Sequence, residues 1–120
     1  MIKKTVIITG ASGDIGKAIA HKFAENNFNL ALISNKNNVE YDDELKEKFD
    51  VEIKNYKFDV SDFAQVENVF NKIFSDFKSV DVLVCNAGIS EKRKLIMDVL
   101  NAEIDEIVDV NLKGSIVCSR

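Results

Sequence analysis

VIITGASGDIGKA, from Val6 to Ala18, is the stretch of sequence that decides the fold. Its β-branched start, residues 6–8, predicts a buried strand that ends at Thr9 and Gly10. Beyond the glycines the apolar residues recur at the spacing of one helix face: Ile15, Ala18, Ile19 and Phe23. We therefore expect a strand, a glycine turn and a helix in direct succession.

Three glycines lie in this turn, at Gly10, Gly13 and Gly16. They suit a tight turn, a close approach of the backbone to a ligand and close packing of the helix on the strand. The first helical turn then presents unpaired N–H groups and a positive dipole end, which favour an anion such as a pyrophosphate. A glycine-rich turn without a ligand is the alternative. A P-loop is excluded because Ala18, after Lys17, stands where the Mg²⁺-binding hydroxyl should be.

The composition is that of one globular domain spanning residues 1–120, with a net charge of −4 and 46% hydrophobic residues. This mild acidity gives no electrostatic footprint for nucleic acid or for an anionic membrane. No apolar run approaches the roughly 20 residues of a membrane span, and the sequence enters its first strand without a signal-peptide core. We expect a cytoplasmic protein.

The two cysteines, Cys85 and Cys118, lie in apolar surroundings without metal-ligand spacing. We expect two buried reduced thiols and no metal site. His21 is the only histidine of the sequence, which excludes a His-rich metal site.

Strands and helices alternate along the chain. Strands are expected at residues 6–8, 29–34, 51–58 and 80–85, and helices from 15, over 41–49, over 61–77 and from 101. Ser61 or Asp62 is the expected N-cap of the third helix. Residues 89–97 are expected to form a loop whose charges are solvated.

This alternation predicts an α/β fold, a doubly wound parallel sheet with strand order 3-2-1-4. Strand 51–58 alternates apolar and polar residues, so we expect it at a sheet edge, whereas strand 80–85 is nearly all apolar and is expected to be central and buried on both faces. Polar segments follow each strand at the same edge of the sheet. A ligand crevice is therefore expected above the carboxyl ends of the first and fourth strands.

Four motifs carry a family resemblance: TGASGDIG at 9–16, Asp59-Val60, Asn86-Ala87-Gly88 and VNLKG at 110–114. In order and approximate spacing they resemble the classical short-chain dehydrogenase/reductases, of the 3-oxoacyl-[acyl-carrier-protein] reductase type, over essentially the whole chain. The resemblance implies a Rossmann-type fold that binds NAD(H) or NADP(H), here truncated before the family's later strands and helices.

The resemblance also implies roles for single residues. Asp59 resembles the side chain that bonds the adenine amino group, and Asn111 resembles the family's catalytic asparagine, which holds a water in a proton relay; a helix kink or cap is the alternative for Asn111. Together with the glycine turn and the end of the second strand, the expected cofactor-binding residues are Gly10, Ser12, Gly13, Ile15, Gly16, Asn35, Lys36, Asp59, Val60, Asn86, Ala87 and Gly88.

The end of the second strand decides between the two cofactors, because an acidic residue there holds the ribose 2′-OH and a basic one accepts a 2′-phosphate. About 20 residues beyond the glycines the chain offers Ser34, Asn35 and Lys36, with neither Asp nor Glu. This favours NADP(H) over NAD(H).

Two departures from the family pattern stand out. Asp14 occupies the place of the second glycine, and the resulting TGxxGxxG spacing looks like that of the family's extended branch. The family's serine and Tyr-x-x-x-Lys pair are also missing, because Tyr41 is followed four residues on by Leu45 and Tyr56 by Val60.

We therefore expect the cofactor half of an NADPH-dependent oxidoreductase that reduces a carbonyl, such as that of 3-oxoacyl-carrier protein, by hydride transfer. The 120-residue chain alone is expected to be inactive. Its expected partners are the dinucleotide, the carbonyl substrate and further copies in a homo-oligomer, with neither nucleic acid nor membrane. A non-catalytic dinucleotide-binding module or sensor is the alternative function.

Overall fold

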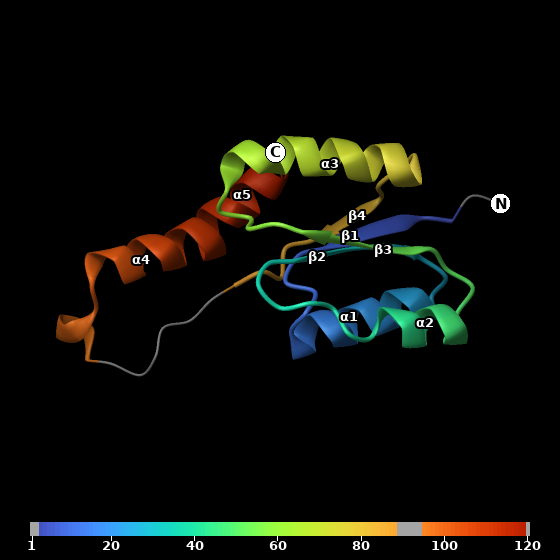
Figure 1. The fold of residues 1–120 in the computed structure, drawn as a ribbon, viewed down its shortest axis with the longest axis horizontal. Helices are drawn as coiled ribbons and strands as arrows, with labels where there is room; N and C mark the ends of the chain where they lie inside the picture. Colours follow the sequence, from blue (N-terminus) through green and yellow to red (C-terminus); the bar gives the residue numbers. More distant parts are fainter. Residues whose placement is uncertain (1–2, 89–94, 120) are drawn as a thin grey trace.

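The structure, a computed structural model, describes residues 3–88 and 95–119. A sheet of four parallel strands forms its middle layer, in the order β3-β2-β1-β4 (Figure 1). The strands are β1 (Thr5–Ile8), β2 (Asn29–Ser34), β3 (Ile53–Lys57) and β4 (Val82–Val84). The predicted α/β class, strand order and edge position of the third strand are confirmed.

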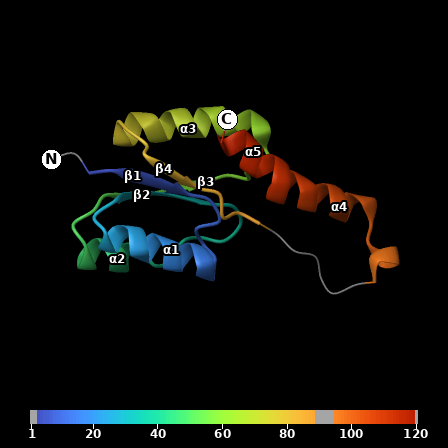
Figure 2. The same ribbon diagram turned by 180° about the vertical axis from the view of Figure 1, so that it is seen from behind.

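Helices cover both faces of the sheet. One face carries α1 (Asp14–Glu25) and α2 (Asp42–Lys48), and the opposite face carries α3 (Phe63–Phe77) and α5 (Gly114–Ser119) (Figures 1 and 2). A 3₁₀ turn, η1 (Ile96–Asp98), precedes α4 (Asn101–Val108), which extends away from the layers and continues through a π-helical turn, η2 (Asp109–Lys113), into α5. None of the described helices is long and apolar enough to cross a membrane.

The core consists of two apolar clusters, one on each side of the sheet. Successive side chains of a strand point to opposite faces, so Val6 and Ile8 join the cluster under α1 and α2, whereas Ile7 joins the cluster under α3 and α5. All three are at most 1% exposed. The sequence of β1 is a continuous apolar run because both faces of the strand are completely buried.

The expected inward face of α1 is wrong at two of its four positions. Ile15 is 69% exposed and Ala18 is also exposed. The residues that α1 buries are Gly16, Ala20 and Ala24, one helical turn apart. Small side chains let the helix axis lie close to the sheet, and this frees Ile15 to project from the first turn.

The expectation that the fourth strand is central and buried on both faces is also wrong. It spans only Val82–Val84, its side chains are half-buried, and in the described part of the chain it pairs with β1 alone. Cys85, which follows it, is exposed, so only Cys118 of the two cysteines is buried; both are free thiols. An apolar strand sequence indicates that the side chains could be buried, but it does not show whether a neighbouring strand is present to bury them.

Asp62 is the N-cap of α3, as expected, although its side chain makes no capping hydrogen bond and Ser61 bonds to Asp59. Two other local expectations need correction. The expected loop at 89–97 includes a 3₁₀ turn from residue 96, and its charged part, residues 89–94, lies outside the described residues. The third strand is shorter than expected at both ends.

Candidate functional site

A cavity of about 680 Å³ opens at the carboxyl ends of the parallel strands. It collects the segments that follow β1, β2, β3 and β4, together with one side of α4 and η2. The described residues that line it are Gly10, Ser12, Gly13, Asp14, Ile15, Gly16, Ile33, Ser34, Asn35, Lys36, Asn37, Phe58, Asp59, Val60, Asn86, Ala87, Gly88, Glu106 and Val110. This is the crevice expected at the point where the strand order reverses.

The glycine turn forms the floor of this cavity. Gly10 has a left-handed φ of 65°, and a Cβ there would lie 2.8 Å from the Cα of Ala87. A Cβ at Gly16 would lie 2.5 Å from the Gly10 carbonyl oxygen. Only glycine fits at either position, because the segment after β4 closes on the turn at Gly10 and α1 packs against the turn at Gly16.

Thr9 joins the ends of β1 and β4, a role that the sequence analysis missed. Its buried hydroxyl accepts hydrogen bonds from the backbone N–H groups of Asn86 and Ala87, each at 2.9 Å. The Asn86 side-chain amide in turn donates to the Gly10 carbonyl at 3.1 Å. A lone hydroxyl at the end of a buried strand was the signal available in the sequence, because a buried hydroxyl needs a partner.

Asp59 and Val60 follow β3 and reach the cavity from its far end. The Asp59 Oδ1 atom accepts hydrogen bonds from the Ser61 N–H at 2.9 Å and from the Ser61 hydroxyl at 2.6 Å. These two bonds hold the Oδ1 atom in place and leave Oδ2 without a share in them. Val60 is buried beneath Gly114, where a Cβ would lie 2.9 Å from its Cγ2, so the end of β3 and the start of α5 are packed directly together.

Asn111 lies in the π-helical turn η2. Such turns widen a helix locally and are frequent at functional sites. Its side chain lies near Gly88, since a Cβ there would be 3.4 Å from the Asn111 Oδ1 atom, and its carbonyl accepts a hydrogen bond from the Ser115 hydroxyl at 3.3 Å. The π-helical turn therefore places Asn111 beside the segment that follows β4, and its role there stays a prediction.

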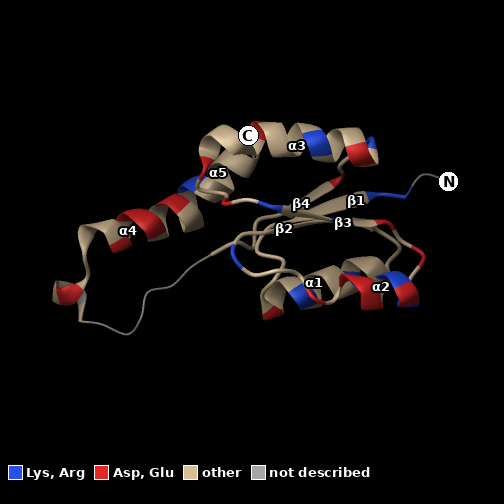
Figure 3. Ribbon diagram, viewed as in Figure 1, with Lys and Arg blue, Asp and Glu red and all other residues tan. Residues whose placement is uncertain are grey.

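The charges around the cavity are of mixed sign. Among the described lining residues Lys36 is the one cation, and Asp14, Asp59 and Glu106 are acidic. Asp14 lies in the first turn of α1, where its carboxylate complements the helix dipole. α4 carries acidic residues and no lysine or arginine, as Figure 3 shows. The cationic end of the cavity is therefore the segment after β2.

All twelve residues expected to bind a cofactor line this one cavity, whereas Asn111 lies beside it. Their role as cofactor contacts stays a prediction. No role at the site was expected for several further lining residues: Ile33, Asn37, Phe58, Glu106 and Val110. Val110 belongs to the VNLKG motif, which carried the family resemblance without a role for Val110 itself, and Glu106 carried no signal in the sequence.

Comparison with known proteins decides the family, because the short chain dehydrogenase family matches residues 4–120. The chain belongs to the short-chain dehydrogenase family. Within it, the chain is 38% identical over 120 residues to the 3-oxoacyl-[acyl-carrier-protein] reductase FabG of Staphylococcus epidermidis, covering 98% of this chain and 48% of that protein. The predicted family is confirmed, and so is the predicted resemblance to 3-oxoacyl-[acyl-carrier-protein] reductases.

Solved structures of short-chain dehydrogenases share the fold. The NADPH-dependent 3-quinuclidinone reductase from Rhodotorula rubra matches with a TM-score of 0.89 and 29% identity over 99% of this chain and 46% of its own. The 3-oxoacyl-[acyl-carrier protein] reductase from Brucella melitensis in complex with NAD matches with a TM-score of 0.90 and 25% identity over 98% and 46%. The chain thus spans about half the length of the short-chain dehydrogenases that it matches.

Proposed function

We propose that this chain is the dinucleotide-binding half of an NADPH-dependent carbonyl reductase that acts on a 3-oxoacyl-carrier protein or a similar carbonyl compound. The observation that carries the proposal is the glycine turn at the floor of the cavity. At Gly10 and Gly16 a side chain would collide with backbone, and at Gly13 the nearest atom to an added Cβ is 3.7 Å away. Backbone can therefore approach a pyrophosphate closely there.

The remaining residues suit the other parts of a dinucleotide. The cavity volume of about 680 Å³ lies in the range of small-molecule sites, roughly 300–1,000 Å³. Asp59, whose Oδ1 is held by Ser61, would offer Oδ2 to the adenine amino group. Asn86 and Gly88 would line the adenosine ribose, and Lys36 would meet a 2′-phosphate.

A bound nicotinamide cofactor supplies the hydride, and the chain's own residues orient it. In this proposal Asn111 holds a water of the proton relay at its place beside Gly88. A group that protonates the carbonyl oxygen is needed for turnover. The 120 residues contain no Tyr-x-x-x-Lys pair to supply it.

The preference for NADP(H) rests on Lys36, the cation of the segment after β2. The similar structures do not share one cofactor, since one is named for NADPH and another was solved with NAD. The choice therefore depends on the residues of this chain. An ammonium group at this place stabilises a 2′-phosphate, and a carboxylate would repel it.

Cofactor titration of the purified 120-residue chain tests this proposal. We expect tighter binding of NADPH than of NADH. Lys36→Asp should weaken NADPH binding by roughly tenfold to a hundredfold, the worth of a hydrogen bond to a charged group, and leave NADH nearly unchanged. Lys72→Asp is the matched control, because this exposed lysine lies on α3 and makes the same charge change away from the cavity.

Tighter binding of NADH, or an unchanged preference in Lys36→Asp, would contradict the NADP(H) assignment. Turnover is the second readout of the same samples. The 120-residue chain alone should reduce no 3-oxoacyl substrate, and detectable reduction would show that another group protonates the product. For the whole enzyme we expect a homo-oligomer of the cytoplasm that serves fatty-acid synthesis.

A further inference from the structure

Tyr41 connects the segment after β2 to the glycine turn. Its hydroxyl donates a hydrogen bond to the Ala11 carbonyl oxygen at 2.7 Å, across 30 residues of sequence. Both residues are buried, Tyr41 at 6% exposure and Ala11 at 0%. Tyr41 is not one of the described residues that line the cavity, so it acts on a ligand only through the turn.

The peptide between Ala11 and Ser12 has one carbonyl and one N–H group. The backbone contains no cis peptide bond in its described part, and in a trans peptide these two groups point in opposite directions. Because Tyr41 holds the Ala11 carbonyl in the buried cluster, the N–H of Ser12 is directed the other way. Ser12 itself lines the cavity, which is where a ligand would lie.

Two further bonds hold the same turn. The Ala11 N–H donates to the Ile33 carbonyl at 2.9 Å, and the Gly10 carbonyl accepts from the Asn86 side chain. The carbonyl oxygens of Gly10 and Ala11 are therefore both engaged by protein donors. An unengaged carbonyl turned toward a pyrophosphate would repel it, whereas an N–H group would bind it.

We infer that Tyr41 is a positioning residue for the dinucleotide: its hydroxyl fixes the Ala11–Ser12 peptide with the N–H group toward the pyrophosphate. This inference rests on the proposed function, because it assigns a part of the same site. Burial, with a smaller contribution from Asp42, raises the pKa of Tyr41 well above its ordinary value. The hydroxyl is therefore a neutral donor at every pH at which the chain would bind a cofactor.

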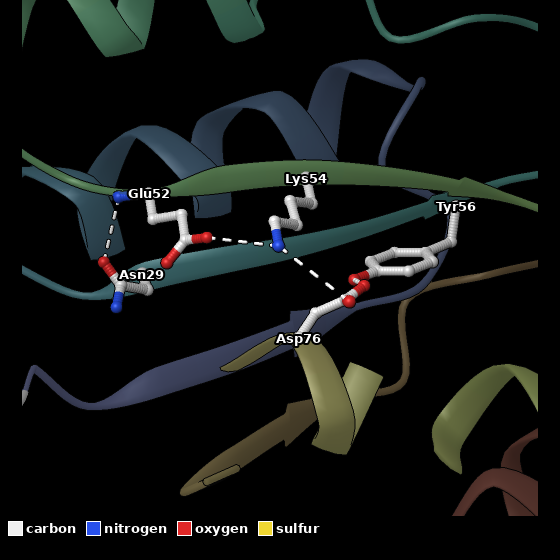
Figure 4. A network of polar contacts seen from close by, with 5 residues as sticks. All are labelled: Asn29, Glu52, Lys54, Tyr56 and Asp76. Atoms are coloured by element: carbon white, nitrogen blue, oxygen red, sulfur yellow. Dashed lines mark hydrogen bonds and ion pairs between the residues drawn. The ribbon is translucent and has the colours of Figure 1, made fainter. Parts of the chain in front are cut away.

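Tyr56 provides a matched control. It is also buried, at 7% exposure, and its hydroxyl donates to the Asp76 Oδ2 atom at 2.6 Å (Figure 4). It belongs to the cluster under α3, on the other side of the sheet from Tyr41. Tyr56→Phe therefore removes a buried hydroxyl of the same kind without touching the glycine turn.

The experiment compares two ligands on the 120-residue chain and on both variants. 2′-Phospho-ADP-ribose contains the pyrophosphate, and 2′-AMP shares its adenine, ribose and 2′-phosphate without it. Tyr41→Phe should weaken binding of 2′-phospho-ADP-ribose by about three- to tenfold, the worth of one hydrogen bond, and change 2′-AMP binding by less than twofold. Tyr56→Phe should change neither affinity by more than twofold.

Equal weakening of both ligands in Tyr41→Phe, no weakening, or an equal effect of Tyr56→Phe would overturn the inference while leaving the proposed function intact. If the unsubstituted chain binds neither ligand, the proposed function itself fails, and the inference fails with it. A second measurement needs no variant. The ¹⁵N–¹H signal of Ser12 should shift on adding 2′-phospho-ADP-ribose and not on adding 2′-AMP, and an unshifted signal would overturn the inference.

Discussion

At the scale of the single residue, Gly16 carries the closest packing of the glycine turn. A Cβ there would lie 2.5 Å from the Gly10 carbonyl oxygen and 2.9 Å from the Cα of Ala11, and backbone atoms do not yield as the end of a side chain would. We expect Gly16→Ala to lower the free energy of unfolding by about 1–3 kcal/mol, as overpacking does. Urea unfolding followed by circular dichroism measures this change.

Gly13 is the control for that prediction. It lies three residues away in the same turn, but its φ is −83° and a Cβ would meet its nearest neighbour at 3.7 Å. Gly13→Ala should therefore change stability by less than about 1 kcal/mol, because the lower entropy of the unfolded chain is offset by the poorer N-cap that alanine makes at the start of α1. Equal losses in the two variants would show that the turn requires glycine for a reason other than the contact at Gly16.

At the scale of the element, the helical stretch η2–α5 docks by one face only. Val110 is 8% exposed and belongs to the cluster under α3, whereas Leu112, two residues on, is 57% exposed. Val110→Ala should lower the free energy of unfolding by about 1.5 kcal/mol, at roughly 0.8 kcal/mol per buried methylene-sized group. Leu112→Ala should stay within about 0.5 kcal/mol of the original chain.

Thermal or urea unfolding of both variants checks this difference. A loss in Leu112→Ala as large as that in Val110→Ala would mean that the exposed face of the helix is covered in solution. Leucine and valine side chains are both strongly hydrophobic, so the different effects are expected from the opposite places of Val110 and Leu112 on the helix.

The arrangement of the sheet could be predicted from the sequence, and the packing of single helices could not. The order of strands and the residues at their carboxyl ends could be predicted, because chain direction and strand alternation fix which segments meet at one edge of a parallel sheet. The inward face of α1 could not be predicted. Gly16 and the other small residues of that face pack closely because of their size, and a hydropathy pattern does not report the size of a side chain. The partners of Tyr41 and Thr9 could not be predicted either, because each side chain bonds to a backbone atom of a distant segment and the sequence does not show which atom that is.

At the scale of the whole molecule, the sheet separates two clusters, and each contains a buried tyrosine bonded across elements. Tyr41 joins α2 to the glycine turn on one side, and Tyr56 joins β3 to α3 on the other. β4 forms an edge of the sheet among the described residues. We expect the 120-residue chain to associate through that edge, because unpaired strand edges accept further strands.

The two tyrosines and Cys118 together predict a loss of stability in alkali. Burial raises the pKa of Cys118 from its ordinary value of 9.0 to about 11, and it raises the pKa values of Tyr41 and Tyr56 well above their ordinary value of 10.0. The folded chain therefore holds these protons more tightly than the unfolded chain. Stability from this source is complete below pH 9 and falls as the pH rises, first through Cys118 and then through the tyrosines.

Urea unfolding at pH 7, 9, 10 and 11 measures this dependence. We expect the free energy of unfolding to change little from pH 7 to just below pH 9 and to fall steadily from pH 9 to 11. Between pH 9 and 10 the fall should be smaller in Cys118→Ala than in the original chain. The comparison isolates the thiol, because every other titrating group is shared by the two chains. A free energy that stays level or rises from pH 9 to 11 would show that these side chains are not buried in the folded protein, and so would count against the two clusters that contain them.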